Sequence, residues 1–276
     1  MVEINTFCIR EFQFNDIAIR AKCKESFEGH LITKESDETG LMIWPATFAL
    51  CEYLLHKREL MSELTVLELG AGAGVVGLVA SHFCSFCNIT DGNEDIVDLL
   101  NENIELNVLN AVGSILKWGE TEELKDNVQY DLILGSDIIY PAITEEVLKK
   151  LFTTVSLLLS SDITSKFIIS FVRRDAKASA QRLLNIATEF SFGGHIIPWQ
   201  TYTTTEPLMG ATVIEFQRKS RTEANDMNNT LGTQIRPDLW DTELLTSDDE
   251  WEAPFMDTDA EENEPEDLEI FSKSFN

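Results

Sequence analysis

Fourteen consecutive residues, beginning at Thr65, place a short apolar strand, a carboxylate, three alternating glycines and a helix start in direct succession: TVLELGAGAGVVGL. The apolar residues before the glycines are typical of a strand buried in a parallel sheet, and those after them form the apolar face of a helix. Between the two, Gly70, Gly72 and Gly74 let the backbone turn tightly and approach a ligand closely. The segment predicts a cradle for a nucleotide-containing cofactor, although a tight strand-to-helix turn without a ligand would use similar residues.

The glycine spacing and the carboxylate before it narrow the choice of ligand. The spacing is GxGxG, whereas the dinucleotide fingerprint places its third glycine one position later. Glu68 precedes the loop, where a negative charge would repel a pyrophosphate but would attract a cationic cofactor. S-adenosylmethionine carries a sulfonium and an amino group, so it fits this loop better than NAD does.

The next two predicted strands end in residues that suit the same cofactor. The strand at 86–90 leads into Asp91, about twenty residues after the glycine loop, where a ribose-binding acid stands in doubly wound sheets. The alternative role for Asp91 is to cap the helix that begins near Asn93. A third strand at 112–117 is followed by Trp118, whose indole could cover the adenine face or could belong to the core.

Polar residues also follow the fourth predicted strand, at 130–135. Ser136, Asp137 and Tyr140 come directly after it. The carboxyl ends of central parallel strands border the crevice where such sheets bind ligands. These three residues are therefore expected at the same site as the glycine loop.

With these pieces in place, the chain resembles the seven-β-strand (class I) S-adenosylmethionine-dependent methyltransferases. More narrowly, it is similar to methyltransferase family 16, which holds protein lysine methyltransferases. The resemblance covers about residues 40 to 218. It is carried by these motifs: Trp44-Pro45-Ala46, Glu68 to Gly74, Thr90-Asp91, Trp118-Gly119, the D-x-x-Y tetrad of Asp137 and Tyr140, and the asparagines at 101, 103 and 107.

The resemblance implies S-adenosyl-L-methionine as the cofactor and a lysine side chain of a protein as the methyl acceptor. Its cofactor-binding residues would be Trp44, Glu68, Gly70, Gly72, Gly74, Asp91, Trp118 and Ser136. The catalytic residues would be Asp137 and Tyr140. Methyl transfer from a sulfonium depends mostly on positioning, but a lysine must first lose its proton, so the site needs acceptors that aim the neutral amine.

Asp137 and Tyr140 suit these tasks. The carboxylate would lie near the amine, the phenol would wall the lysine channel, and Trp44 could form part of the opposite wall. Asp137 could instead cap the helix that starts near Thr144. Other functions stay open: methylation of protein arginine or histidine, methylation of a small molecule, or a non-catalytic binding module with the same fold. An NAD-dependent oxidoreductase is disfavoured by the loop spacing and Glu68.

The pattern along the chain predicts an α/β fold with a doubly wound, mostly parallel seven-stranded sheet whose last strand is antiparallel. Alternating apolar residues within 6–24 predict an N-terminal β-hairpin. The expected strands are 65–69, 86–90, 112–117, 130–135, 167–172, 194–199 and 211–217. The expected helices are 46–56, 74–84, 94–107, 144–159 and 176–190. The domains would be a hairpin extension at 1–40, a methyltransferase domain at 41–220 and a disordered acidic tail at 221–276.

Charge divides the chain unevenly. The 276 residues carry a net charge of −27, and from Thr222 onward 17 Asp and Glu face only two Lys and Arg. Such a polyanion disfavours binding to nucleic acid and to anionic membranes. A protein substrate with a basic surface is the expected partner, and a monomer is the expected state.

The remaining composition argues against secretion and against a metal site. The start of the chain has no basic segment followed by an apolar run, so the cytosol or the nucleus is expected. Five cysteines are an odd number and should stay reduced. Cys84 and Cys87 form a CxxC without a second pair nearby, so no metal is expected.

Overall fold

A computed structural model describes residues 7–24, 38–120, 128–140, 143–173 and 180–219. The predicted acidic tail lies outside the described residues. Among the helices that are described, none combines the length and apolarity needed to cross a membrane.

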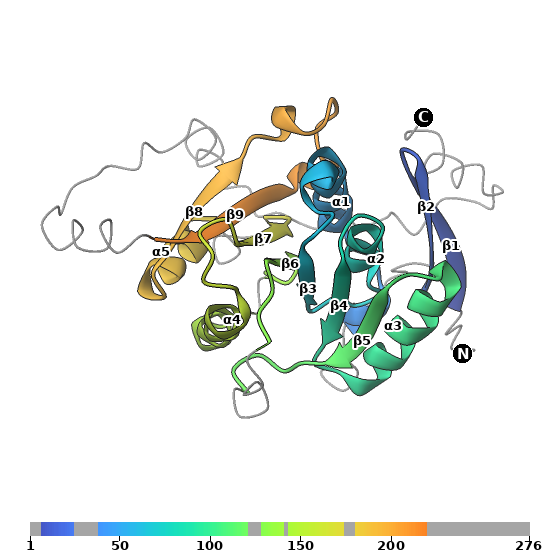
Figure 1. The fold of residues 1–276 in the computed structure, drawn as a ribbon, viewed down its shortest axis with the longest axis horizontal. Helices are drawn as coiled ribbons and strands as arrows, with labels where there is room; N and C mark the ends of the chain where they lie inside the picture. The colour runs from blue at the N-terminus through green and yellow to red at the C-terminus, as the bar shows by residue number, and fades with distance from the viewer. Residues whose placement is uncertain (1–6, 25–37, 121–127, 141–142, 174–179, 220–276) are drawn as a thin grey trace, which may run out of the picture. The chain divides into compact units, whose positions relative to one another are not determined.

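The centre of the fold is a seven-stranded sheet with the order β5-β4-β3-β6-β7-β9-β8 (Figure 1). The first five of these strands run parallel to one another. Their bounds are β3 Thr65–Leu69, β4 Phe86–Asp91, β5 Ala111–Ile115, β6 Leu132–Ser136 and β7 Lys166–Phe171. The strand order reverses between β3 and β6, so the carboxyl ends of β3, β4 and β6 border a crevice of the kind that binds ligands in doubly wound sheets.

The last strand of the chain lies between two other strands and runs antiparallel to both. β9 (Thr212–Arg218) pairs antiparallel with β7 on one side and with β8 (Phe192–Ile197) on the other. Only the short turns η3 (Trp199–Thr201) and η4 (Leu208–Gly210) connect β8 to β9. The predicted α/β sheet with an antiparallel last strand is confirmed.

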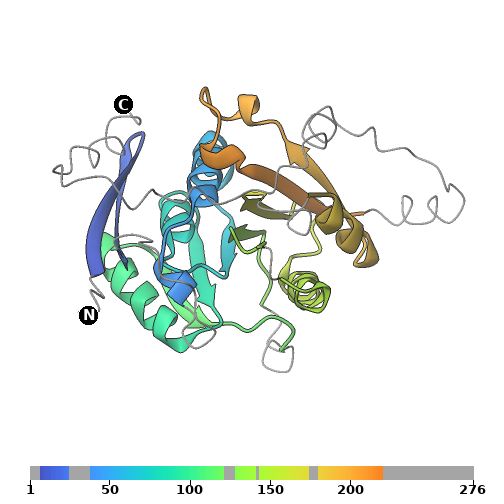
Figure 2. The same ribbon diagram turned by 180° about the vertical axis from the view of Figure 1, so that it is seen from behind.

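Helices cover both faces of the sheet (Figures 1 and 2). Their bounds are α1 Pro45–Lys57, α2 Val75–Ser81, α3 Glu94–Asn107, α4 Glu145–Leu158 and α5 Ala180–Glu189. Apolar residues of α1, α2 and α3 pack with Val66 and Leu134 on one face. Those of α4 and α5 pack with Leu67 and Ile133 on the other face. Successive strand residues therefore bury opposite sides, which explains why the central strands are continuous apolar runs.

The predicted N-terminal hairpin is present. β1 (Phe7–Phe14) pairs antiparallel with β2 (Ile17–Lys24), and Asn15 adopts a φ of 51° in the turn between them. Ile19 and Ala21 of β2 are fully buried in the cluster that α1, α2 and α3 share. The hairpin thus contributes to the same core as the helices.

Several predicted boundaries were wrong by two or three residues. Helix α2 ends at Ser81 instead of 84, and β6 starts at Leu132 instead of 130. Strand β8 starts at Phe192 instead of 194, because Phe192 and Gly193 also pair with Arg218 and Gln217 of β9. A Cβ on Gly194 would lie 2.6 Å from the ring of Phe216, so strand packing requires that glycine. The first residues of the helix predicted at 176–190 lie outside the described part of the chain.

Candidate functional site

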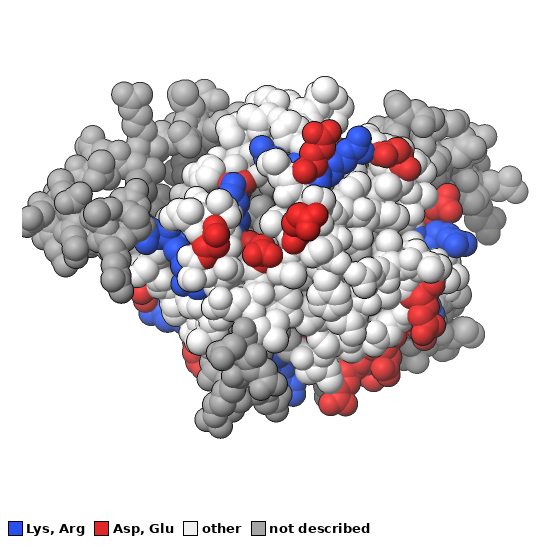
Figure 3. Space-filling model, in the orientation of Figure 1, with Lys and Arg blue, Asp and Glu red and all other residues white. Residues whose placement is uncertain are grey.

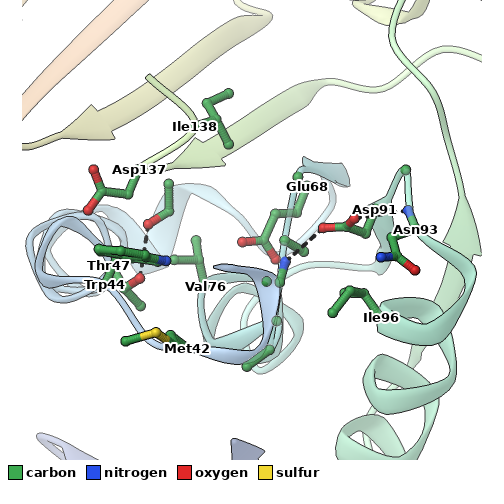
Figure 4. A pocket seen from close by; sticks show the side chains of 18 of the residues that line it. Met42, Trp44, Thr47, Glu68, Val76, Asp91, Asn93, Ile96, Asp137 and Ile138 are labelled. Atoms are coloured by element: carbon green, nitrogen blue, oxygen red, sulfur yellow. Dashed lines mark hydrogen bonds between the residues drawn. The ribbon is translucent and has the colours of Figure 1, made fainter. Parts of the chain in front are cut away.

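A cavity of about 810 Å³ opens at the carboxyl ends of β3, β4 and β6 (Figure 4). Its volume lies within the range of pockets that hold cofactor-sized ligands. Every site residue predicted from the sequence lines it: Trp44, Glu68, Gly70, Gly72, Gly74, Asp91, Trp118, Ser136, Asp137 and Tyr140. The fold thus brings together residues from five separate segments of the chain.

The three loop glycines all adopt left-handed backbone conformations. The φ angles are 63° at Gly70, 55° at Gly72 and 80° at Gly74. A Cβ on Gly72 would lie 2.8 Å from the carbonyl oxygen of Gly40, and one on Gly74 would lie 2.5 Å from Leu100. Conformation and close packing therefore both require glycine at these positions.

Glu68 is a buried carboxylate at the floor of the cavity. Its side chain is 1 % exposed, and its Oε2 accepts a 2.7 Å hydrogen bond from the N–H of Gly77 in α2. Burial raises the pKa of Glu68 to about 8, the Gly77 N–H opposes that shift, and the charge of Asp91 adds to it. A cation in the cavity would stabilise the ionised form of this buried acid and so lower its pKa.

Gly77 was missed by the sequence analysis. A Cβ there would lie 2.5 Å from Oε2 of Glu68 and 2.7 Å from Ile89, so only glycine leaves room for the Glu68 hydrogen bond. The one signal for it in the sequence is a glycine inside a predicted helix, a position that normally disfavours glycine.

Asp91 connects the glycine loop to the start of α3. Its two carboxylate oxygens accept hydrogen bonds from the backbone N–H groups of Gly72 and Asn93, each at 3.1 Å. The helix α3 begins at Glu94 and is capped by Asn93, whose Oδ1 accepts from the N–H of Asp95 at 2.9 Å. The alternative in which Asp91 caps this helix is therefore wrong.

Two tryptophans line different parts of the cavity. Trp118 is partly buried beside the loop, since a Cβ on Gly70 would lie 3.2 Å from its ring. Trp44 immediately precedes α1 and its indole points into the cavity (Figure 4). The hydroxyl groups of Ser136 and Thr47 lie 3.1 Å apart, so the end of β6 is connected to the first turn of α1.

Asp137 leaves the end of β6 in a left-handed conformation, with a φ of 51°. Its backbone N–H donates to the Ser170 carbonyl at 2.8 Å, and its carboxylate accepts a longer 3.4 Å contact from the N–H of Val172. Asp137 does not cap the next helix: Thr144 does so, because its Oγ1 accepts from Val147.

The residues after Asp137 shape the mouth of the cavity. Ile138 is 6 % exposed and lies against the loop, since a Cβ on Gly70 would come within 2.9 Å of it. Tyr140 is 45 % exposed and lines the same cavity. The predicted D-x-x-Y tetrad thus brings one carboxylate and one phenol to the same cavity, and the two isoleucines between them in sequence are buried.

Some lining residues carried no sequence signal. They include Met42, Ile43, Thr47, Ile96 and Lys150. No motif marks them, because only the fold brings their segments to the loop. Within the described ranges, no three His, Cys, Asp or Glu side chains form a group that could hold a metal ion.

A family model described as lysine methyltransferase matches residues 27–189, more than half of the chain. The chain belongs to the lysine methyltransferase family. This membership confirms the resemblance inferred from the glycine loop, the strand-end acids and the D-x-x-Y tetrad.

Individual relatives match parts of the chain. Protein N-lysine methyltransferase METTL21A of Danio rerio is 37 % identical over 126 residues, covering 44 % of this chain and 56 % of the relative. Histone-arginine methyltransferase METTL23 of Xenopus laevis is 30 % identical over 150 residues, covering 52 % and 62 %. The chain thus spans about half the length of the curated relatives it matches.

A solved structure supports the fold. The 16S rRNA N2 G1207 methyltransferase RsmC of T. Thermophilus, in complex with AdoMet and guanosine, superimposes with a TM-score of 0.56. The match covers 77 % of this chain and 51 % of that chain, at 15 % sequence identity. The likeness concerns the Rossmann-like architecture alone.

Proposed function

We propose that this protein is an S-adenosylmethionine-dependent methyltransferase that methylates a lysine side chain of a protein substrate. One observation carries the proposal: a single cavity joins the glycine loop and two carboxylates, Glu68 and Asp91, to the Asp137–Tyr140 pair. Membership of the lysine methyltransferase family supports it.

The residues around the cavity fit the cofactor. When bound, S-adenosylmethionine supplies an electrophilic methyl group on a sulfonium. Glu68 offers a negative charge to its cationic end, and ionises more readily once a cation is near. Asp91 has acceptor oxygens for ribose hydroxyls, and Trp118 offers an aromatic face for the adenine. The glycine loop lines the cavity with backbone, and a Cβ on Gly70, Gly72 or Gly74 would collide with neighbouring protein atoms and displace the loop.

The acceptor end of the cavity suits a neutral amine. A lysine in water has a pKa of about 10.4, and an apolar channel lowers it by disfavouring the ammonium. Trp44 and Ile138 provide apolar surface, while Asp137 and the phenol of Tyr140 provide acceptors that orient the nitrogen. Holding the amine in line with the methyl group supplies most of the acceleration.

A basic protein surface fits the charge of the described domain. The outer face of α3 carries five exposed carboxylates and no Lys or Arg (Figure 3): Glu94, Asp95, Asp98, Glu102 and Glu105. Long-range attraction would favour a cationic partner over nucleic acid. Five free cysteines fit a reducing compartment, so we also propose a cytosolic or nuclear enzyme that acts as a monomer.

Arginine methylation is the second candidate, because METTL23 is named a histone-arginine methyltransferase. A guanidinium stays charged at neutral pH and is usually held by carboxylates through paired hydrogen bonds. At the outer part of this cavity Asp137 is the carboxylate available among the described residues that line it, whereas Glu68 and Asp91 lie at the loop. A guanidinium would thus find one carboxylate rather than several there, which favours lysine over arginine as the acceptor.

The test is to incubate the full chain with a cell lysate and isotopically labelled S-adenosylmethionine, and to identify labelled residues by mass spectrometry. An Asp137→Asn variant, which keeps side-chain size, serves as the control that is expected to lose activity. Label on lysine that is absent with the control supports the proposal. If the label is found on arginine or histidine, that residue and not lysine is the methyl acceptor. If the protein binds the cofactor but transfers no label, it is a non-catalytic binding module.

A further inference from the structure

Asn103 is a fully buried polar residue on α3, with an exposed fraction of 0 %. Its Oδ1 accepts a 2.7 Å hydrogen bond from the N–H of Lys22 in β2. Its Nδ2 donates to the carbonyl of Lys22 at 3.2 Å and to the carbonyl of Ala73 at 2.9 Å. One amide therefore joins three segments: the hairpin, α3 and the glycine loop. Buried amides of this kind are retained where all their hydrogen bonds are made.

The contact with Ala73 reaches the cofactor cradle itself. Ala73 is 2 % exposed, lines the cavity, and stands between Gly72 and Gly74, both of which have positive φ. The other side of the loop is fixed by bonds from Ala71 to Thr90 and from Gly72 to Asp91. The Asn103 amide orients the loop from the direction of α3.

The contact with Lys22 belongs to a repeated arrangement. One turn along α3, Asn107 accepts from the N–H of Arg20 at 2.9 Å and donates to its carbonyl at 2.7 Å. Four helical residues rise by about 6 Å and two strand residues by about 6.6 Å, so the two amides match alternate backbone groups of β2. They form hydrogen bonds with the backbone N–H and C=O groups on the edge of β2 that faces away from β1, as a neighbouring strand would.

Only one of these two amides touches the loop in the hydrogen bonds found among the described residues. The amide nitrogen of Asn107 also donates to the backbone carbonyl of Asn103 at 2.7 Å, within α3. Asn103 and Asn107 thus hold the hairpin in the same way and differ in the bond to Ala73. This difference supplies a matched control within the chain.

We propose that Asn103 is a positioning residue that couples docking of the N-terminal hairpin to the conformation of the cofactor loop. The hairpin then acts as a part of the cofactor site although none of its residues lines the cavity. The inference rests on the proposed function, because it assigns the loop to S-adenosylmethionine. Coupling between two sites is reciprocal: cofactor binding must tighten the hairpin as much as the hairpin tightens the cofactor.

The test compares Asn103→Ala and Asn107→Ala in the full chain by calorimetric titration with S-adenosylhomocysteine and by thermal unfolding. Both variants should lower the melting temperature, because each removes two bonds to β2. Asn103→Ala should also weaken binding by roughly tenfold, since it leaves the Ala73 carbonyl without this donor. Asn107→Ala should change the dissociation constant by less than about twofold.

A third variant keeps only the acceptor of Asn103. Asn103→Asp retains an oxygen for the Lys22 N–H but loses the Nδ2 donor to the carbonyls of Ala73 and Lys22, so it should weaken cofactor binding as Asn103→Ala does. In activity assays, both Asn103 variants should raise KM for S-adenosylmethionine and leave kcat near the wild-type value. A residue with a purely structural role would lower the melting temperature without this split.

The wild-type protein provides a further measurement if the Asn103 variants fail to fold. Hydrogen exchange of the β2 amides should slow when S-adenosylhomocysteine binds, beyond any change in β8, which is remote from the loop. Equal exchange in β2 with and without ligand would overturn the coupling, as would equal affinities for Asn103→Ala and wild type. Absence of ligand binding by the wild type would instead overturn the proposed function.

Discussion

Glu68 shows how a single residue can link the stability of the fold to its ligand. It is buried at the base of the cavity and is bonded to the N–H of Gly77. Burial raises its pKa to about 8, so without a ligand the folded protein holds a proton there that an unfolded chain releases near pH 4.5. The stability from this site is complete below pH 4.5 and is lost as pH rises through 8.

This sign gives a prediction for Glu68→Gln, which keeps the acceptor for Gly77 but cannot titrate. Between about pH 5 and pH 9 the melting temperature of the wild type should fall relative to that of the variant, by about 2–4 °C for each kcal/mol of linkage. Scanning calorimetry in the absence of cofactor measures both curves. Parallel curves would mean that Glu68 titrates normally. Glu215 is another buried acid with a shifted pKa: burial raises it, but hydrogen bonds with Lys166 and Tyr53 outweigh burial and lower it. Its contribution to the pH dependence is the same in both proteins, so it cancels in the comparison.

At the same scale, Asp137 and Tyr140 should differ in their contribution to turnover. Asp137 has a φ of 51°, which Asn tolerates better than Ala, so Asp137→Asn is the cleaner substitution. It should lower kcat by at least about 100-fold if the charge orients the amine, with an unchanged circular dichroism spectrum. Tyr140→Phe should cost about tenfold or less, because the ring still walls the channel.

Single-turnover methylation of the identified acceptor decides between these residues. Wild-type rates in Asp137→Asn would mean that the tetrad is incidental to catalysis. A larger loss for Tyr140→Phe than for Asp137→Asn would transfer the main orienting role to the phenol.

At the scale of elements, the packing of β3 against α2 depends on Gly77, a glycine within the helix. A Cβ at Gly77 would lie 2.5 Å from the Glu68 carboxylate, whereas a Cβ at Gly92 would meet nothing closer than 3.7 Å. Gly92 is exposed and lines the cavity, so it is an uncrowded control for the buried Gly77.

Gly77→Ala should therefore destabilise the protein by about 1–3 kcal/mol, despite the better helix propensity of alanine, because the Glu68 bond and the contact with Ile89 must give way. It should also weaken cofactor binding. Gly92→Ala should leave the melting temperature and the affinity within error. Urea unfolding and calorimetry measure the two effects, and equal stability of both variants would contradict the steric argument.

The elements that the sequence predicted best are those with a local code. The strand, glycine loop and helix around residues 65–78 could be predicted because the backbone conformation itself demands Gly70, Gly72 and Gly74. Acids at strand ends could be placed because parallel strands share one functional edge. Alternating apolar residues with Asn15 at the turn were sufficient for the hairpin.

The features that were missed depend on contacts between segments distant in sequence. The early start of β8 follows from the pairing of Phe192 and Gly193 with Arg218 and Gln217 of β9, which no local pattern shows. The amide of Asn103 joins residues 30 and 81 positions away, so its helix position alone could not indicate a role at the loop. Gly40 lines the cavity, and its carbonyl oxygen would lie 2.8 Å from a Cβ on Gly72, 32 residues further along the chain.

At the scale of the whole molecule, charge is the main property that remains to be assigned. The chain carries a net charge of −27, and the segment after Arg221 holds 17 of its 48 acidic residues and two of its 21 basic ones. A segment of this composition can steer a basic protein toward the site, and salt screens such steering. It can also act only as a solubilising appendage.

Truncation after Arg221 separates the two roles. The sequence of the removed segment has no helical or strand periodicity that would let it join the core. We therefore expect the melting temperature and the affinity for S-adenosylhomocysteine to stay close to those of the full chain. A large drop in melting temperature would show that the segment packs on the domain.

If steering operates, the truncated enzyme should have a lower kcat/KM on its full-length protein acceptor at low salt, and the difference should shrink as salt rises. The physical reason is the Debye length, which falls from about 30 Å at 0.01 M to about 8 Å at 0.15 M ionic strength. A short peptide acceptor with little net charge serves as the control, because both enzymes should methylate it equally. Equal rates on the protein acceptor at every ionic strength would leave the acidic segment without a part in substrate encounter.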